Sequence, residues 1–177
     1  MKPLIWLGLI CMAAPIATCA QGSVTNPVTA GVQEIYDRQS KRIVAAAEEM
    51  PADKYDYRPT PEQWTFGKIV AHVAQVDYLV CSMISDNPVP KDFKVGESDP
   101  KDKLVQAVQA SLDFCSQSLA TLQDSKMGDP ITFFGGRKTT RARAALELVA
   151  DLVDHYSQLA SYLRLNGMLP PSAQPQK

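Results

Sequence analysis

The chain has 177 residues, 45% of them apolar, and its 18 basic and 19 acidic residues give a net charge of −1. This length suits one ordinary domain, and the apolar fraction is too high for an intrinsically disordered chain. The near-neutral charge argues against bulk electrostatic binding to nucleic acid or to an anionic membrane surface, so we expect no nucleic-acid partner.

Residues 1–20 have the pattern of a secretory signal peptide. A lysine follows the initiating methionine, an apolar run extends from Leu4 to Ile16, and Thr18-Cys19-Ala20-Gln21 offers small residues to a signal peptidase. The run of about 13 residues is too short to span a hydrocarbon core about 30 Å thick comfortably. We expect cleavage after Ala20, a periplasmic or secreted mature protein of charge −2, and no membrane contact after cleavage. The alternatives are an uncleaved anchor and a lipid anchor on Cys19, before which threonine is unusual.

The first long helix is predicted from about Val28 to Met50. Asn26-Pro27 supplies a capping residue and a proline at the first helical position, and Pro51 ends the helix. The apolar side chains recur at helical spacing, at Val32, Ile35, Tyr36, Ile43 and Ala47. A polar connection, residues 52–63, follows.

The second and third helices are predicted on either side of a long polar connection. The second spans roughly Thr65 to Ser85, and residues 86–99 form the connection. Asp99-Pro100 again offers a cap followed by proline at the start of the third helix. Both helices carry apolar stripes, at Ile69, Val73, Val76, Leu79, Val80 and Met83 and at Leu104, Val108, Leu112, Cys115, Leu119 and Leu122.

The fourth helix is predicted from about Thr140 to Leu165. Asn166-Gly167 supplies the left-handed residue that ends many helices, and Pro170-Pro171 follows. Before the helix, a Gly-Gly pair within residues 131–138 indicates a small hairpin, too short to form a sheet of its own. Residues 168–177 are expected to be a flexible tail.

Four long amphipathic helices predict an all-α fold, a four-helix bundle covering residues 24–167. After signal cleavage only Cys81 and Cys115 remain, and an even pair in an exported protein predicts a disulfide, with two buried thiols as the alternative. The two cysteines lie about 16 and 15 residues into their helices, so they are level only if the second and third helices run parallel. We therefore predict that residues 86–99 cross over the length of the bundle.

The two histidines, His72 and His155, lie on the apolar stripes of the second and fourth predicted helices. His72 follows Ile69 by three positions and precedes Val76 by four. Asp151 lies four positions before His155, so both side chains leave the same helix face. Two imidazoles and one carboxylate can ligate one divalent metal and leave positions open, which suits zinc, nickel or iron. From spacing alone, a metal-free Asp–His hydrogen bond and an ordinary core histidine remain alternatives.

Two stretches resemble the DinB/YfiT-like superfamily. Trp64-Thr-Phe-Gly-Lys-Ile-Val-Ala-His72-Val-Ala-Gln-Val-Asp77 resembles its second-helix motif, and residues 151–167 resemble its fourth-helix motif. The order and spacing of the four helices also match. The resemblance implies a four-helix bundle of unusual topology with a divalent metal held by three histidines. Carried onto this chain, it places His72 and His155 at the first and third ligand positions, and Asp151 at the second, where it changes the charge and the metal preference.

The resemblance also bears on function. The superfamily includes thiol-dependent S-transferases and a thiol-dependent isomerase that use cytosolic thiols. This chain carries an export signal, so the resemblance does not assign it the substrates of those enzymes. We expect a divalent-metal-binding protein, acting as a metal-dependent transferase or hydrolase on a small-molecule substrate. A non-catalytic metal- or ligand-binding helical module is the alternative, and a homodimer is left open.

Other candidate residues lie near these positions or at the start of the fourth helix. Asp154 and Gln158 can orient a ligand or a water, or simply form a solvated face. A basic group can recognise an anionic substrate or form a solvated face; it comprises Arg137, Lys138, Arg141 and Arg143. Trp64 and Tyr162 are expected to be packing residues.

Overall fold

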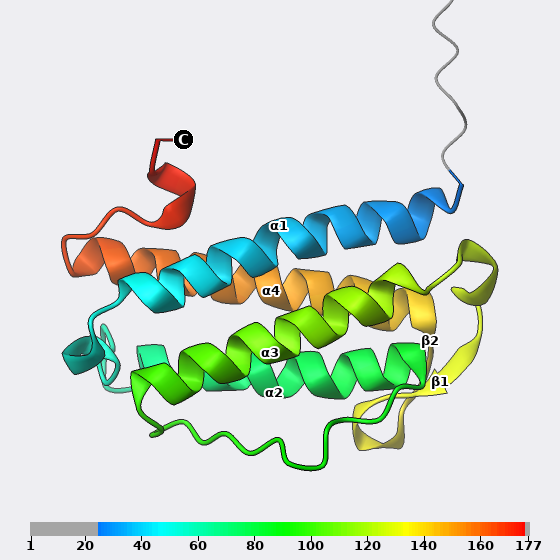
Figure 1. The fold of residues 1–177 in the computed structure, drawn as a ribbon, viewed down its shortest axis with the longest axis horizontal. Helices are drawn as coiled ribbons and strands as arrows, with labels where there is room; N and C mark the ends of the chain where they lie inside the picture. The colour runs from blue at the N-terminus through cyan, green and yellow to red at the C-terminus, as the bar shows by residue number, and fades with distance from the viewer. Residues whose placement is uncertain (1–24, 176–177) are drawn as a thin grey trace, which may run out of the picture.

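The computed structural model describes residues 25–175, so the predicted signal peptide and Cys19 lie outside the described residues. Four α-helices and a small hairpin form one bundle (Figure 1). Among the described residues, no helix is long and apolar enough to cross a membrane.

Helix α1, Pro27–Glu49, begins with proline at its first turn, as predicted, but its N-terminal cap differs from the prediction. Asn26 has a left-handed backbone (φ 58°), and its side chain does not cap the helix. Instead, the carboxylate of Asp124 accepts from the backbone N–H groups of Val28 (3.0 Å) and Thr29 (2.8 Å). The free N–H groups of a helix end can donate to any correctly placed carboxylate, and here the fold supplies one from 95 residues away.

Helices α2, Phe66–Ser85, and α3, Lys101–Ala120, run parallel, and the segment between them returns along the length of the bundle (Figure 1). Both α1 and α4 run in the opposite direction. The Cα atoms of Cys81 and Cys115 lie 5.3 Å apart and the two residues form a disulfide between α2 and α3. The predicted crossover and the predicted disulfide are therefore both confirmed.

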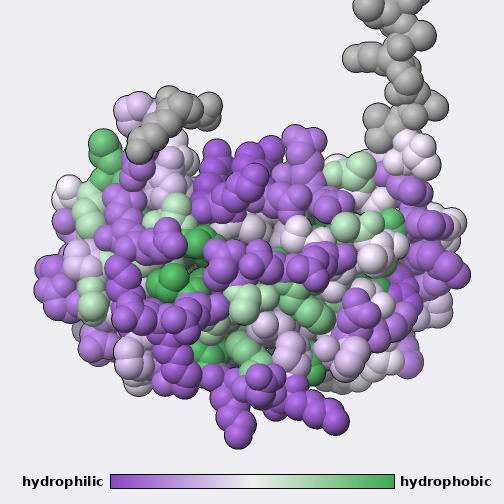
Figure 2. Space-filling model, in the orientation of Figure 1, coloured by the Kyte–Doolittle hydropathy of each residue, from purple (hydrophilic) through white to green (hydrophobic). Residues whose placement is uncertain are grey.

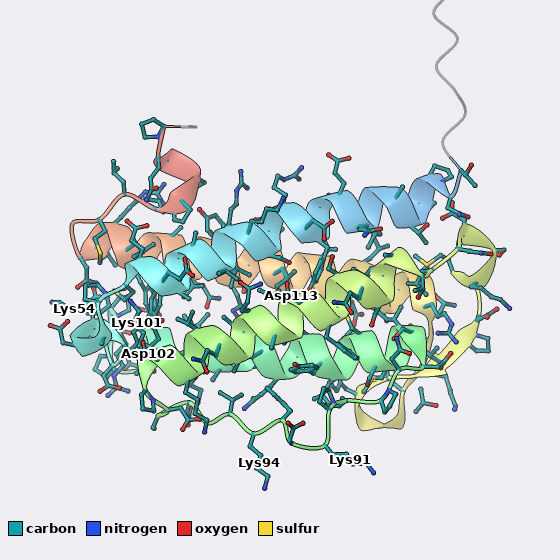
Figure 3. All side chains as sticks on the ribbon, in the orientation of Figure 1. Lys54, Lys91, Lys94, Lys101, Asp102 and Asp113 are labelled. Atoms are coloured by element: carbon teal, nitrogen blue, oxygen red, sulfur yellow. A yellow bond between two sulfur atoms is a disulfide. The ribbon has the colours of Figure 1, made fainter. Side chains whose placement is uncertain are left out.

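The crossover segment is held against α2 at several points. Gln75 donates its side-chain amide to the carbonyl of Val95 (3.0 Å), and the ring of Phe93 packs on Tyr78 with centroids 4.4 Å apart. Lys91 and Lys94 of the same segment point away from the bundle (Figure 3). The segment thus combines an apolar inner side with a charged outer side.

The predicted cap of α3 is wrong. Pro100 holds the N-cap position and no side chain caps the helix. The carboxylate of Asp99 instead accepts from the N–H of Gly96 (2.8 Å) and pairs with Lys103 (2.8 Å). It therefore closes the end of the crossover segment and does not cap the helix.

The predicted hairpin is present as strands β1, Pro130–Thr132, and β2, Lys138–Thr140, which pair antiparallel. The chain reverses through Gly135 and Gly136, whose φ angles of 67° and 77° favour glycine. The hairpin lies at the end of the bundle where α4 begins (Figure 1).

Helix α4, Arg141–Leu165, is capped by Thr140, whose hydroxyl accepts from the N–H of Arg143 (3.2 Å). At its other end Gly167 has φ 77°, and the N–H of Met168 reaches the carbonyl of Leu163 (3.0 Å), as the sequence predicts. Beyond Gly167 the chain differs from the predicted flexible tail. A short 3₁₀ turn, Pro171–Ala173, packs on the bundle, and the N–H of Ser172 donates to the hydroxyl of Tyr156 (2.8 Å).

The core lies between the four helices and is made of the predicted apolar stripes. Its largest fully buried side chains are Tyr36, Phe66, Ile43, Met50, Ile69, Ile84, Leu104, Leu112, Leu148, Leu152, Leu159 and Leu163. The face formed by α1 and α3 is mostly hydrophilic, with hydrophobic residues visible in the hollow between the two helices (Figure 2). This hollow of about 460 Å³ is lined by residues such as Val44 and Leu112.

Candidate metal centre

Helix α2 places His72 on the side of the bundle that faces α4. The hydroxyl of Thr65 accepts from the N–H of Lys68 (3.1 Å), which fixes the start of the helix just before Phe66. His72 therefore lies in the second turn, half-buried. Burial lowers the pKa of His72, and the neighbouring His155 lowers it further, so the metal-free imidazole favours the neutral form that binds metals.

Helix α4 brings Asp151 and His155 to His72. The metal-binding atoms of the three residues all lie within 4.8 Å of one another. His155 is buried, whereas the side chain of Asp151 is 32% exposed, so the cluster sits where the α2–α4 interface meets solvent. The sequence predicted that these residues converge inside the bundle, and the structure brings them together at the edge of the core.

Gln158 and Asp154 fix the orientation of His155. The side-chain N–H of Gln158 donates to the carboxylate of Asp154 (2.8 Å), which leaves the amide oxygen of Gln158 facing Nδ1 of His155 (3.3 Å). Because an amide oxygen only accepts, Nδ1 is the protonated nitrogen. Nε2, which lies 3.5 Å from Oδ1 of Asp151, then faces the cluster with its lone pair when the ring is neutral.

Asp151 controls the charge of His155 in the metal-free protein. Burial by itself lowers the pKa of His155, but the hydrogen bond and negative charge of Asp151 outweigh it, so the net pKa of His155 is raised. The two histidines are thus shifted in opposite directions, with His72 favouring the neutral form. Both must be neutral to bind a metal, so protons compete with the metal at His155 first.

The three residues fit a divalent metal by their chemistry and spacing. In a tetrahedral site with metal–ligand distances of about 2.0–2.2 Å, ligand atoms lie roughly 3.4 Å apart. The distance of 3.5 Å between Oδ1 of Asp151 and Nε2 of His155 is already close to this value. The ligand atoms of all three residues lie within 4.8 Å of one another, so a small side-chain movement at His72 completes the tetrahedral spacing. Two neutral imidazoles and one carboxylate are ligands that zinc, nickel and iron accept.

Trp64 covers both imidazoles, a placement that its prediction as a packing residue missed. Its indole ring lies 4.9 Å from the ring of His72, edge to face, and stacks at 17° on His155 with centroids 6.0 Å apart. The hydroxyl of Tyr162 donates to the backbone carbonyl of Trp64 (2.9 Å), and Lys68 lies over the indole at 5.2 Å. The fold thus brings a residue from the connection before α2 onto the candidate metal centre.

Asp77 is a second residue that the sequence reasoning passed over. It is only 1% exposed, and its Oδ2 atom has no hydrogen-bond partner. Burial raises the pKa of Asp77 well above its usual range, and the negative charge of Asp151 raises it further. A signal was present in the sequence, since Asp77 falls on the apolar stripe of α2 between Val73 and Cys81.

The basic residues at the start of α4 are held by partners within the protein. Arg141 is largely buried and bonds to the carbonyl of Ile84 and to the carboxylate of Asp86, which ties the end of α2 to α4. Arg137 and Arg143 both pair with Glu147, at 2.9 and 2.7 Å. These contacts favour a structural role over the recognition of an anionic substrate.

Comparison with known proteins agrees with this architecture. The family model of the DinB superfamily matches residues 35–159, and the chain therefore belongs to that superfamily. No curated protein matches the chain.

Solved structures share the fold at low sequence identity. A DinB-like protein from Bacillus subtilis aligns with a TM-score of 0.65 at 19% identity, over 82% of this chain and 99% of that one. A DinB-like protein from Bacillus cereus aligns at 0.63 and 15% identity, over 80% and 95%. A variant of a mycothiol-dependent maleylpyruvate isomerase aligns at 0.62 and 11% identity, over 74% of this chain and 60% of that chain.

Proposed function

We propose that this protein binds one divalent metal through His72, Asp151 and His155 and acts on a small molecule as a metal-dependent transferase or hydrolase. One observation carries the proposal: three metal-binding side chains from two helices have their ligand atoms within 4.8 Å of one another. A divalent metal bound there supplies a Lewis acid that polarises a substrate oxygen or lowers the pKa of a bound water.

The residues around the cluster support a reactive site over a purely structural one. A structural metal is normally enclosed by four protein ligands, whereas this cluster supplies three and the side chain of Asp151 is 32% exposed. Gln158 holds His155 with Nε2 toward the cluster, and the indole of Trp64 packs on both rings. Together these contacts prepare the ligands and leave one side of the cluster accessible.

The cellular location is part of the proposal. The Cys81–Cys115 disulfide fits a periplasmic or secreted protein, because disulfides persist in oxidising compartments. The mycothiol-dependent isomerase is a structural neighbour at 11% identity and supports the fold alone, so we assign no thiol cofactor from it.

Metal analysis of the protein purified from its exported form tests the proposal. We expect about one zinc, nickel or iron per chain, and a melting temperature that falls when a chelator removes it, because a ligand that binds only the folded state stabilises it. The variant His72→Ala should lose the metal and the chelator effect together. Substoichiometric metal with an unchanged melt in the wild type would leave only an Asp–His hydrogen bond, in favour of a non-catalytic module.

A further inference from the structure

A hollow of about 420 Å³ opens beside the candidate metal centre. It lies between the connection that precedes α2 and the later turns of α4. Its lining includes Glu62, Trp64, Asp154, Gln158 and Tyr162, together with His155. A molecule in this hollow therefore touches a candidate metal ligand and the glutamine that orients it.

Two other hollows of comparable size do not border the cluster. The hollow between α1 and α3 has none of the three candidate ligands in its lining. A further hollow of about 380 Å³ lies next to Trp64 and is lined by Arg58 and Lys68, again with none of the three. Of these three hollows, the one beside His155 is thus the one that a candidate metal ligand lines, whereas His72 and Asp151 lie outside its lining.

Trp64 lines both of these hollows, together with Glu62 and Gln63. The hydroxyl of Tyr162 donates to the backbone carbonyl of Trp64, and its indole stacks on His155 and lies under the ammonium of Lys68. Arg58 and Lys68 line the neighbouring hollow and not the one beside His155.

The lining of the hollow beside His155 has a definite charge. Glu62 and Asp154 contribute two carboxylates, and no lysine or arginine lines it. Asp154 accepts from the neutral side-chain amide of Gln158 (2.8 Å) and forms no salt bridge with the described residues, so its charge is not neutralised by an ion pair. These two carboxylates attract a cation in the hollow and repel an anion, and solvent partly screens the effect because both side chains are exposed.

We infer that this hollow binds the small molecule that reaches the metal centre, and that this molecule carries an ammonium or similar cationic group. The metal-binding end of the molecule lies toward His155 and the cationic end lies between Glu62 and Asp154. The part of this inference that concerns the metal rests on the proposed function, whereas the charge preference of the hollow does not.

Three two-carbon thiols that differ in one terminal group test the inference. Cysteamine carries an ammonium, 2-mercaptoethanol a hydroxyl and mercaptoacetate a carboxylate. Each is titrated into the cobalt-loaded mature protein, and the near-ultraviolet band of a thiolate on cobalt gives its affinity. The same titrations are run on the double variant Glu62→Gln/Asp154→Asn. Comparing the ratio of thiol affinities between the two proteins removes the differences in cobalt affinity that the thiols have by themselves. We expect the ratio of cysteamine to mercaptoacetate affinity to fall roughly fivefold in the double variant.

A second signal locates the thiols independently of the metal. Trp64 is the single tryptophan left after cleavage at residue 20, so its indole N–H gives one resonance in an amide correlation spectrum. Cysteamine should shift this resonance in metal-free protein, and mercaptoacetate should shift it less. The double variant has two exposed side chains changed, so its melt should match the wild type. Because Asp154 also holds Gln158, the single variant Glu62→Gln, which leaves that contact intact, should lower the affinity ratio in the same direction.

The outcomes separate the two proposals. If cobalt binds but the affinity ratio is unchanged in the double variant, the inference about the hollow is overturned and the metal site stands. If the protein does not bind cobalt, the proposed metal site fails, and the indole resonance alone then tests the hollow. An indole resonance that responds equally to cysteamine and mercaptoacetate overturns the charge preference in either case.

Discussion

Asp151→Asn is the substitution that best separates a metal site from a hydrogen-bonded pair. It keeps the size of the side chain but removes the negative charge that faces Nε2 of His155 at 3.5 Å. An amide is a much poorer ligand for zinc or nickel than a carboxylate, so the variant keeps only the two imidazoles as good ligands.

The expected loss of affinity follows from the number of ligands. Structural zinc sites gain about 10–16 kcal/mol from four ligands, so one ligand contributes roughly 2.5–4 kcal/mol. We therefore expect Asp151→Asn to weaken metal binding about 10²- to 10³-fold. If His72 and His155 were the only metal ligands, the substitution would change the metal affinity much less.

Fluorescence of Trp64 provides the assay, because its indole lies 4.9 Å from His72. Nickel or cobalt should quench this fluorescence as it binds, and zinc competes without quenching. The titration is run at about pH 8, above the usual histidine pKa, where protons compete least with the metal. In the wild type, affinity should fall as the pH drops through the raised pKa of His155.

The matched control is Asp113→Asn, an exposed carboxylate on α3 that faces the side of α1 (Figure 3). It changes the net charge by the same amount and should leave metal affinity unchanged. Equal affinity in wild type and Asp151→Asn would refute the ligand role of Asp151. A similar loss in both variants would mean that the effect is one of net charge.

Three further predictions concern stability. Replacing Cys81 and Cys115 by alanine opens a loop whose ends are 34 residues apart, and should lower the free energy of unfolding by about 3–4 kcal/mol in urea titrations; an unchanged midpoint would contradict this. Asp77→Asn should raise the melting temperature at neutral pH, because it removes a buried ionisable group that lowers the free energy of unfolding by about 1–3 kcal/mol. Because burial raises the pKa of Asp77, the wild-type folded state loses stability as the pH rises through that raised pKa. The difference in melting temperature between the variant and the wild type should therefore grow with pH, and it should vanish below about pH 4, where Asp77 is protonated in both the folded and the unfolded state. Arg141→Ala should lower stability by about 1–3 kcal/mol, since it leaves the carbonyl of Ile84 unpaired, whereas the exposed Arg143→Ala should cost less than about 1 kcal/mol; equal melts would refute the structural role of Arg141.

The sequence was sufficient for the secondary structure and for much of the topology. The apolar stripes gave the four helices, and Gly167 marked the end of α4 because few other residues tolerate its φ of 77°. If Cys81 and Cys115 form a disulfide, their equal depths require α2 and α3 to be parallel, and the structure confirms both the disulfide and the direction. Helical spacing likewise placed Asp151 and His155 on one face.

The tertiary structure decided which distant groups meet. Asn26 and Asp99 have the residue types of helix caps, yet Asp124 from the segment after α3 caps α1, and no side chain caps α3. Trp64 lies outside every helix, so no periodicity could place its indole on the two imidazoles. Periodicity describes only the face on which a side chain leaves its own helix. The depth of a group and its partners depend on how the helices pack, which is why the cluster lies at the edge of the α2–α4 interface and not deep in the core.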